Sequence, residues 1–204
     1  YIYDSAFNSE ASYGCTNSNA DNYNPEALID DGSCEFSQII NFNEGWNWVS
    51  FNIIPNEALL FDIISPIQNN VSLAINETGY AIFQNQNNNQ WIDNIGEWYP
   101  SEGYLIKMSN NDNLEILGSN QVSTPYTINL SSGWNIISFP IQSSNGENVE
   151  TVLTELLDNE LVYTMFDEDG QVYIPDYITG GVAQNSIGIM YPGKGYYLKV
   201  NDDA

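Results

Sequence analysis

Apolar and polar residues alternate along much of the chain with the two-residue period of β-strands. The alternation is clearest over residues 39–42 and 126–130. Each of these segments is followed by a Glu-Gly or Ser-Gly turn and by a second apolar segment that begins Gly-Trp-Asn, at Gly45 and at Gly133. We therefore predict two strands joined by a tight turn at each place.

The same order of segments occurs twice. Residues 45–51 return as 133–139, and residues 98–108 return as 190–200. Between these anchors, residues 74–83 match 165–174, and each of these segments contains a glycine at which a hairpin turn is expected. The turns are Glu77-Thr78-Gly79 and Glu168-Asp169-Gly170. The pattern predicts a duplicated unit that ends in a strand with a Gly-Tyr-x-x-Lys signature.

Each unit also contains one segment with helical periodicity. In the second unit, five apolar residues share one face behind a cap at Ser144 or Asn148; they are Val149, Val152, Leu153, Leu156 and Leu157. In the first unit the pattern is less regular, and Pro66 is expected to end the helix; the apolar residues are Ala58, Leu59, Phe61, Ile63 and Ile64.

These elements predict an α+β fold that is mostly β. We expect a small disulfide-closed element over 1–36, a first β-rich unit over 37–122 and a second over 123–204, each unit with one short helix. The sequence begins at Tyr1 without Met or a charged and apolar leader, and we expect a mature fragment or one part of a longer protein.

Charge and composition exclude several classes of function. The chain has 27 Asp and Glu against 3 Lys and Arg, a net charge of −24, and no His. Such a surface repels nucleic acids and anionic lipids, and no apolar segment is long enough for a membrane helix. Without His there is no Ser-His-Asp triad and no ordinary zinc site, and without Arg no guanidinium can clamp a phosphate. The remaining catalytic possibility is a pair of carboxylates, such as Asp167 and Asp176. Such a pair would make the chain a glycoside hydrolase, which is our third and least favoured hypothesis.

Two cysteines, Cys15 and Cys34, bracket a short segment rich in side-chain oxygens. A disulfide between them would indicate an oxidising compartment, and free thiols are the alternative. We expect calcium to bind the oxygens of Asn17, Asn19, Asp21, Asn24, Asp30 and Asp31. The competing interpretation is that these side chains close Asx turns.

The segment from Gly14 to Cys34 resembles a cysteine-bracketed repeat of secreted proteins from marine Bacteroidetes, and it is similar to the Asp-rich calcium repeats of thrombospondin type 3. Asn17 replaces the usual Asp after Cys-Thr. The Gly-Trp-Asn units resemble repeats of large bacterial surface and secreted proteins, and Asp4-Ser5-Ala6 resembles a Bacteroidetes O-glycosylation acceptor. These resemblances imply a modular spacer or adhesive domain on the cell exterior and imply no reaction.

The aromatic residues divide into two groups. Those present in both units are expected in the cores; they are Trp46, Trp134, Tyr104 and Tyr196. Those specific to one unit are candidates for stacking on sugar rings: Trp48, Trp91, Trp98, Tyr99, Tyr173 and Tyr177. Lys107 and Lys199 occupy matching positions, where we expect local salt bridges. An isopeptide bond is the alternative, and it would require a buried acid beside the lysine.

The favoured function is a non-enzymatic structural or adhesive module, outside the cell or on its surface, with calcium and a disulfide stabilising the first element. Its partners would be neighbouring copies or modules of the same surface protein. The alternative is a carbohydrate-binding module that uses exposed Trp and Tyr residues. Nucleic acids and direct membrane insertion are excluded as partners.

Overall fold

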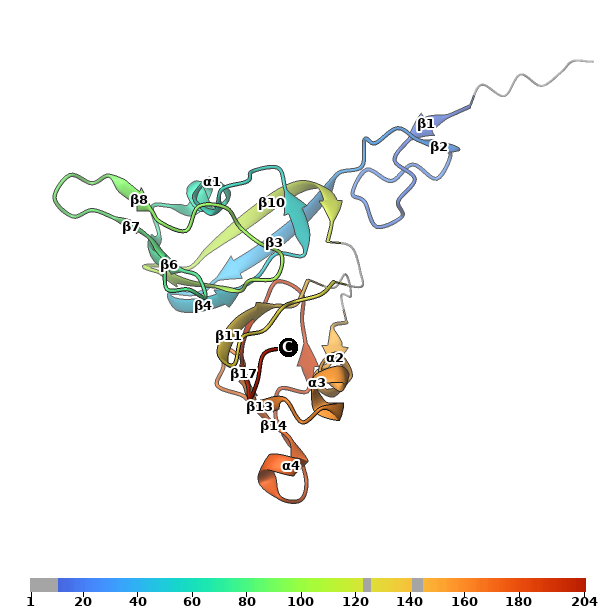
Figure 1. Cartoon of the computed structure of the whole chain (residues 1–204). Coiled ribbons are helices and arrows are strands. Elements are labelled where there is room, and N and C mark those ends of the chain that lie inside the picture. Colours follow the sequence, from blue (N-terminus) through green and yellow to red (C-terminus); the bar gives the residue numbers. More distant parts are fainter. Residues whose placement is uncertain (1–10, 123–125, 141–144) are drawn as a thin grey trace, which may run out of the picture.

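The computed structural model describes residues 11–122, 126–140 and 145–204. The acceptor-like Asp4-Ser5-Ala6 and the candidate cap Ser144 lie outside these ranges. Strands make up 41% of the described residues and helices 11%, which confirms a mostly β, α+β fold. Figure 1 shows two β-rich parts and, at one end of the first, a small element near the N-terminus.

The first unit contains a five-stranded antiparallel sheet with the order β4-β9-β6-β7-β8. Its strands are β4 (Gly45–Val49), β6 (Val71–Ile75), β7 (Ala81–Gln84), β8 (Trp91–Asp93) and β9 (Tyr104–Met108). The Gly-Trp-Asn strand β4 lies at the edge and pairs with the Gly-Tyr-x-x-Lys strand β9, so that Trp46 is opposite Lys107. The first unit does not end with this strand, because β10 follows it.

The second unit repeats this arrangement strand for strand, with the order β11-β17-β13-β14-β15. Its strands are β11 (Gly133–Ser138), β13 (Val162–Phe166), β14 (Val172–Ile174), β15 (Gln184–Asn185) and β17 (Gly195–Val200). Trp134 is opposite Lys199, as Trp46 is opposite Lys107. The hairpin turns predicted at Gly79 and Gly170 join β6 to β7 and β13 to β14, where both glycines have positive φ.

The asparagine of each Gly-Trp-Asn segment is buried and closes the turn before its strand. Asn47 accepts the backbone N–H of Asn43 and donates to the carbonyl of the same residue, both at 2.8 Å. Asn135 makes the matching pair of bonds with Ser131, at 2.9 and 2.8 Å. The motif therefore provides its own turn, because the amide of Asn supplies both a donor and an acceptor.

A second sheet, with the order β3-β10-β5, completes the first unit. Its strands are β3 (Phe36–Phe42), β5 (Ile53–Pro55) and β10 (Asp112–Gln121). Buried and exposed residues alternate along β3 as the sequence predicts. In the second unit the prediction of a strand over 126–130 is wrong: this segment belongs to no strand, although Leu130 and Ala204 exchange two backbone hydrogen bonds. The alternation of apolar and polar residues is present, but a β-strand also needs a neighbouring strand. Among the described residues, this segment pairs only at Leu130 and Ala204.

The predicted helices are present but shorter or interrupted. In the first unit, α1 (Leu60–Ile64) continues into the 3-10 helix η1 (Ser65–Ile67). The α-helix ends at Ile64, before Pro66 as predicted. Pro66 lies in the first turn of η1, where its missing N–H has no intrahelical partner to lose. Ala58 and Leu59 precede the helix.

The helix of the second unit is split at Leu153 into α2 (Val149–Val152) and α3 (Thr154–Asp158). The cap at Asn148 is confirmed, because its side chain accepts the N–H of Glu150 at 2.8 Å. A further short helix, α4 (Asp176–Thr179), follows β14. Two short strands, β12 (Glu147–Asn148) and β16 (Ile189–Met190), pair beside α2.

The buried apolar residues form two clusters, one for each unit. Tyr104 and Tyr196 lie in these cores, as predicted. The hydroxyl of Tyr104 accepts the N–H of Tyr99, and that of Tyr196 accepts the N–H of Tyr191, both at 2.8 Å. Each core tyrosine thus satisfies its polar end within its own unit.

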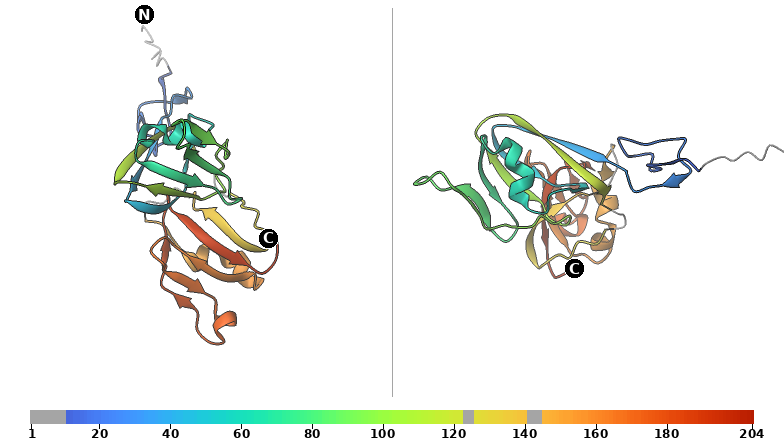
Figure 2. Two further views of the ribbon diagram at one scale, coloured as in Figure 1. Left: turned by 90° about the vertical axis from the view of Figure 1, so that its left-hand side faces the viewer. Right: turned by 90° about the horizontal axis from the view of Figure 1, so that it is seen from above.

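The N-terminal element is small and stands out from one end of the first unit (Figures 1 and 2). It contains the parallel pair β1 (Tyr13–Gly14) and β2 (Ile29–Asp30) and the disulfide between Cys15 and Cys34. Cys15 is buried and belongs to the hydrophobic cluster of the first unit.

Candidate functional site

The two units meet through backbone hydrogen bonds that are repeated at matching positions. The N–H of Ser50 donates to the carbonyl of Gly193 at 3.1 Å, and the N–H of Ser138 donates to the carbonyl of Ser101 at 3.2 Å. Because Ser50 matches Ser138 and Gly193 matches Ser101, the contact has an approximate twofold symmetry.

Two isolated β-bridges follow the same symmetry. Val49 pairs with Lys194, and Ile137 pairs with Glu102. The serine hydroxyls add bonds across the junction, from Ser50 to the carbonyl of Lys194 at 2.7 Å and from Ser138 to the carbonyl of Pro100. These bonds are buried or partly buried, so they fix the orientation of one unit against the other.

A glutamate from a hairpin turn lies at each end of this junction. Glu168 accepts the N–H of Trp48 at 3.0 Å and forms an ion pair with Lys194. Glu77, the matching residue of the first unit, has a hydrogen bond with the backbone of Ile136. Its neighbour is not a lysine but Glu102, which occupies the position of Lys194. One end of the junction therefore has opposite charges and the other end has like charges.

The like-charge end is electrostatically unfavourable. Burial raises the pKa of Glu77, and the charge of Glu102 raises it further, against a lowering by the hydrogen bond from Ile136. Burial also raises the pKa of Glu102, and a hydrogen bond with Tyr104 opposes this. Among the described residues, the buried Oε2 of Glu102 has no hydrogen-bond partner.

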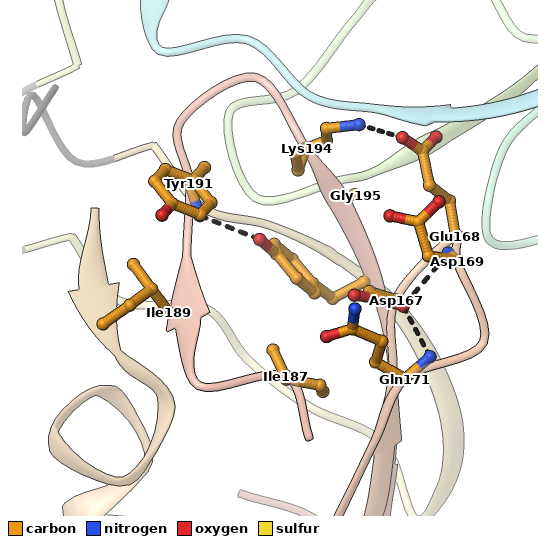
Figure 3. A pocket seen from close by; sticks show the side chains of 10 residues that line it. Asp167, Glu168, Asp169, Gln171, Ile187, Ile189, Tyr191, Lys194 and Gly195 are labelled. Carbon is orange, nitrogen blue, oxygen red and sulfur yellow. Dashed lines mark hydrogen bonds and ion pairs between the residues drawn. The ribbon is translucent and has the colours of Figure 1, made fainter. Parts of the chain in front are cut away.

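A small pocket of about 150 Å³ lies beside the opposite-charge end, and Figure 3 shows its side chains. The acidic turn of residues 167–169 forms one side, and Lys194 and Tyr196 lie next to it. Burial raises the pKa of Tyr196 to about 12 and lowers that of Lys194, which the charge of Asp167 partly opposes. Pockets for organic ligands have volumes of roughly 300–1,000 Å³, so this one is too small for such a ligand.

An open aromatic hollow of about 340 Å³ lies where Trp48 meets the second unit. It is lined by Trp48, Trp134, Phe166 and Tyr197. The rings of Trp48 and Tyr197 meet edge to face with centroids 4.8 Å apart, and Trp134 lies 6.0 Å from Tyr197 and 5.9 Å from Phe166. Flat apolar rings on an open surface are suited to stacking against a sugar ring or another apolar surface.

The structure corrects the placement of the shared tryptophans. Trp46 is 46% exposed and Trp134 is 49% exposed, so neither is the core residue that the sequence predicts. Their side chains point out because each follows the turn glycine at a position whose neighbour, Asn47 or Asn135, points inward. In both units a lysine covers the exposed indole.

Lys107 lies over Trp46 and Lys199 lies over Trp134, each with the ammonium 5.7 Å from the ring centroid. The prediction of salt bridges at Lys107 and Lys199 is wrong. Among the described residues, the only ion pair is that of Lys194 with Glu168. Lys107 is exposed, which is not the buried setting that an isopeptide bond requires.

The remaining sugar-binding candidates do not gather with Trp48. Trp91 packs against Phe61 with centroids 5.4 Å apart, and Trp98 packs against Phe51 at 5.8 Å. Tyr177 donates its hydroxyl to the carbonyl of Val162 at 2.8 Å. Tyr173 is buried and Tyr99 is half exposed. Of the sugar-binding candidates specific to one unit, Trp48 alone lines the hollow.

The Cys15–Cys34 segment holds the predicted metal ligands within one small loop, most of them in Asx turns. Asn17, Asn24 and Asp31 each accept the backbone N–H of the second residue after them, at 3.0 Å. Asp30 accepts from Gly32 at 2.9 Å, and the hydrogen bond from Ser33 lowers the pKa of Asp31. Asp21, a further predicted ligand, is exposed in the same loop, and Asn19 lies there too.

No group of three or more His, Cys, Asp or Glu side chains in the described ranges is arranged to hold a metal ion. Amide and backbone oxygens, which calcium also accepts, lie outside that set. The calcium site thus stays a prediction.

The carboxylate pair considered for glycoside hydrolysis is also used in local turns. Asp167 accepts the N–H of Gln171 at 2.8 Å, and Asp176 accepts that of Tyr177 at 2.8 Å at the start of α4. Sequence reasoning missed the junction residues Glu77, Glu102 and Glu168. A signal was present, since a glutamate occurs at the same place in both hairpin turns.

Among the described residues, no helix has the length and apolar character needed to cross a membrane. Models of protein families, curated proteins and solved structures give no match to this chain.

Proposed function

We propose that this chain is a rigid, non-enzymatic structural module of an extracellular or cell-surface protein, working in series with neighbouring copies or modules. The observation that supports it best is the junction, where matching backbone hydrogen bonds join the two units. A flexible linker leaves two domains free to rotate, whereas paired backbone bonds between strands and loops hold them as one body.

The disulfide supports the location, because such bonds form and persist in oxidising compartments. The net charge of −24 supports a solvated surface and argues against nucleic acid or anionic lipid as a partner. In this proposal calcium binds the oxygens of the Cys15–Cys34 loop and, with the disulfide, stiffens the element that precedes the first unit.

Calorimetry tests whether the two units act as one body. A rigid module unfolds in one transition whose calorimetric and van't Hoff enthalpies agree. Two separate transitions, one for each unit, would contradict the proposal. Glu168→Ala removes both the bond from Trp48 and the ion pair, and is expected to split or broaden the transition; Glu147→Ala, at an exposed position of the second unit, is the control.

A second candidate function is carbohydrate binding, and the aromatic hollow supports it. The matched face of the first unit has Leu105 and Ile75 where the second has Tyr197 and Phe166, so it lacks two of the rings that line the hollow. Titration of tryptophan fluorescence with a panel of soluble oligosaccharides provides the test. Binding that Trp134→Ala abolishes and Trp46→Ala preserves would support this function, and no binding by the wild-type chain would reject it.

A further inference from the structure

The second unit contains the beginning of a sheet that is complete in the first unit. In the first unit, β3 pairs with β10 from Phe42 opposite Asp112 to Phe36 opposite Gly118. In the second unit the matching segment is 126–130, and Leu130 and Ala204 are at the positions of Phe42 and Asp112. The N–H of Leu130 donates to the carbonyl of Ala204 at 2.6 Å, and the N–H of Ala204 donates to that of Leu130 at 2.9 Å.

The turn that leads into this ladder is also the same in both units. The N–H of Glu44 donates to the side chain of Asn111 at 2.7 Å, and the N–H of Ser132 donates to the side chain of Asp203 at 2.7 Å. Asp203 precedes Ala204 as Asn111 precedes Asp112. The path of residues 201–204 is therefore already that of a strand entering beside 126–130.

Within the described ranges, no strand pairs with 126–130 beyond Leu130. The backbone hydrogen bonds of this segment to other described residues are the two that join Leu130 and Ala204. In an antiparallel pair, hydrogen-bonded positions alternate, so the N–H groups of Ile128 and Tyr126 are the next to point toward an added strand. A row of such groups is a template for pairing with another strand.

The inward side of this edge is incompletely covered. Ile40 of β3 is 6% exposed, packed in the core that Leu114 and Ile116 of β10 complete. Its counterpart Ile128 is only partly buried against the core of the second unit, and Tyr126 is 37% exposed. An added strand with apolar residues opposite these two positions would cover both.

We propose that Tyr126–Leu130 is a strand-accepting edge, and that its occupant is a strand joined directly to Ala204 that has apolar residues at alternate positions. The register follows from the first unit: residues matching Leu114 and Ile116 lie opposite Ile128 and Tyr126. Main-chain bonds supply the affinity and the alternate side chains supply the specificity, as in other cases of strand addition. This inference is independent of calcium and of sugar binding.

The test extends the full chain after Ala204 with a copy of residues 113–117, Asn-Leu-Glu-Ile-Leu. The control extension has the same length, with serine at the positions of Leu114 and Ile116. Hydrogen exchange of the Ile128 and Tyr126 amides is followed by NMR in the unextended chain and in both extended chains. We expect the copied strand to slow exchange of both amides at least about tenfold, and the control to leave them near the unextended rate.

Equal exchange rates with the two extensions would overturn the proposal. It would also be overturned if the unextended chain already protects both amides and sedimentation shows a dimer, because the occupant would then be a second copy pairing edge to edge. Comparison of the folded spectra ensures that the extended chains are native, since signals of the first unit are expected to be unchanged.

Discussion

Glu77 lies close to Glu102 at one end of the junction between the units. Burial raises the pKa of Glu77, and the charge of Glu102 raises it further. At the matching end of the same junction, Glu168 forms an ion pair with Lys194. The two ends share a backbone bridge and a glutamate that holds a backbone N–H, and differ in the sign of one side chain. This difference makes the junction testable by charge exchange.

Reversing the charge of Glu102 and reversing that of Lys194 should change the stability in opposite directions. Glu102→Lys replaces a repulsion with an attraction and is expected to raise the free energy of unfolding by about 0.5–1 kcal/mol, the range for partly exposed ion pairs. Lys194→Glu should lower it by a similar amount. Guanidinium unfolding measures both; a loss of stability in Glu102→Lys would show that the two carboxylates do not repel.

The pH dependence follows from the direction of the pKa shifts. Glu77 and Glu102 have pKa values raised above their ordinary 4.5, so the folded state holds these protons more tightly than the unfolded state. Their contribution is fully present below pH 4.5 and is lost as the pH rises through the raised values. The wild-type chain should therefore lose stability relative to Glu102→Gln as the pH rises above 4.5. Parallel pH profiles for the two proteins would refute this assignment.

A methyl group at Gly103 should disturb the junction. A Cβ there would lie 2.8 Å from the carbonyl oxygen of Ile137 and 2.9 Å from a side-chain carbon of Ile136, closer than packed atoms approach. Gly103→Ala is expected to cost about 1–3 kcal/mol. Gly195→Ala meets its nearest atoms at 3.2 Å and should cost less, while Gly181→Ala, with open space around it, should be neutral. Thermal unfolding ranks the three, and a cost at Gly181 as large as at Gly103 would contradict the packing.

The lysines that lie over the two indole rings should make a small but measurable contribution to the free energy of unfolding. Lys199 lies over Trp134 and 4.5 Å from the ring centroid of Tyr163, whereas Lys107 lies over Trp46 alone. Lys199→Met keeps the apolar stem, removes the charge and should cost about 0.5–1 kcal/mol, more than Lys107→Met. If Lys107→Met proves the more costly in urea unfolding, the rings do not attract the ammonium groups as described.

Local patterns in the sequence predicted β3 and, in each five-stranded sheet, the Gly-Trp-Asn strand, the hairpin and the Gly-Tyr-x-x-Lys strand, but neither β8 nor β15. Alternation marked β3, and turn glycines marked the hairpins at Gly79 and Gly170. The exposure of Trp46 and Trp134 was not predictable from their presence in both units, because a shared position can be shared for its surface packing as well as for its core. The segment 126–130 shows the same limit: its pattern is that of a strand, but pairing depends on a partner that the pattern does not specify.

The junction was outside the reach of sequence reasoning for a related reason. Backbone groups make most of its bonds, from Ser50 to Gly193 and from Ser138 to Ser101, and backbone groups are the same in every residue. The side chains at the junction did leave a trace, as glutamates at the same place in two turns and as Ser50 and Ser138 at matching positions of the repeat. The Cys15–Cys34 pairing was predictable because the chain contains no other cysteine.

The stiffness of the N-terminal element is the central claim of the proposed module, and amide hydrogen exchange over residues 12–35 tests it most directly. The exchange is measured with calcium, with a chelator and with a reductant. The proposal predicts slow exchange in oxidised, calcium-loaded protein and an increase of at least about tenfold when either the metal or the disulfide is removed. Exchange over residues 12–35 that neither treatment changes would contradict it.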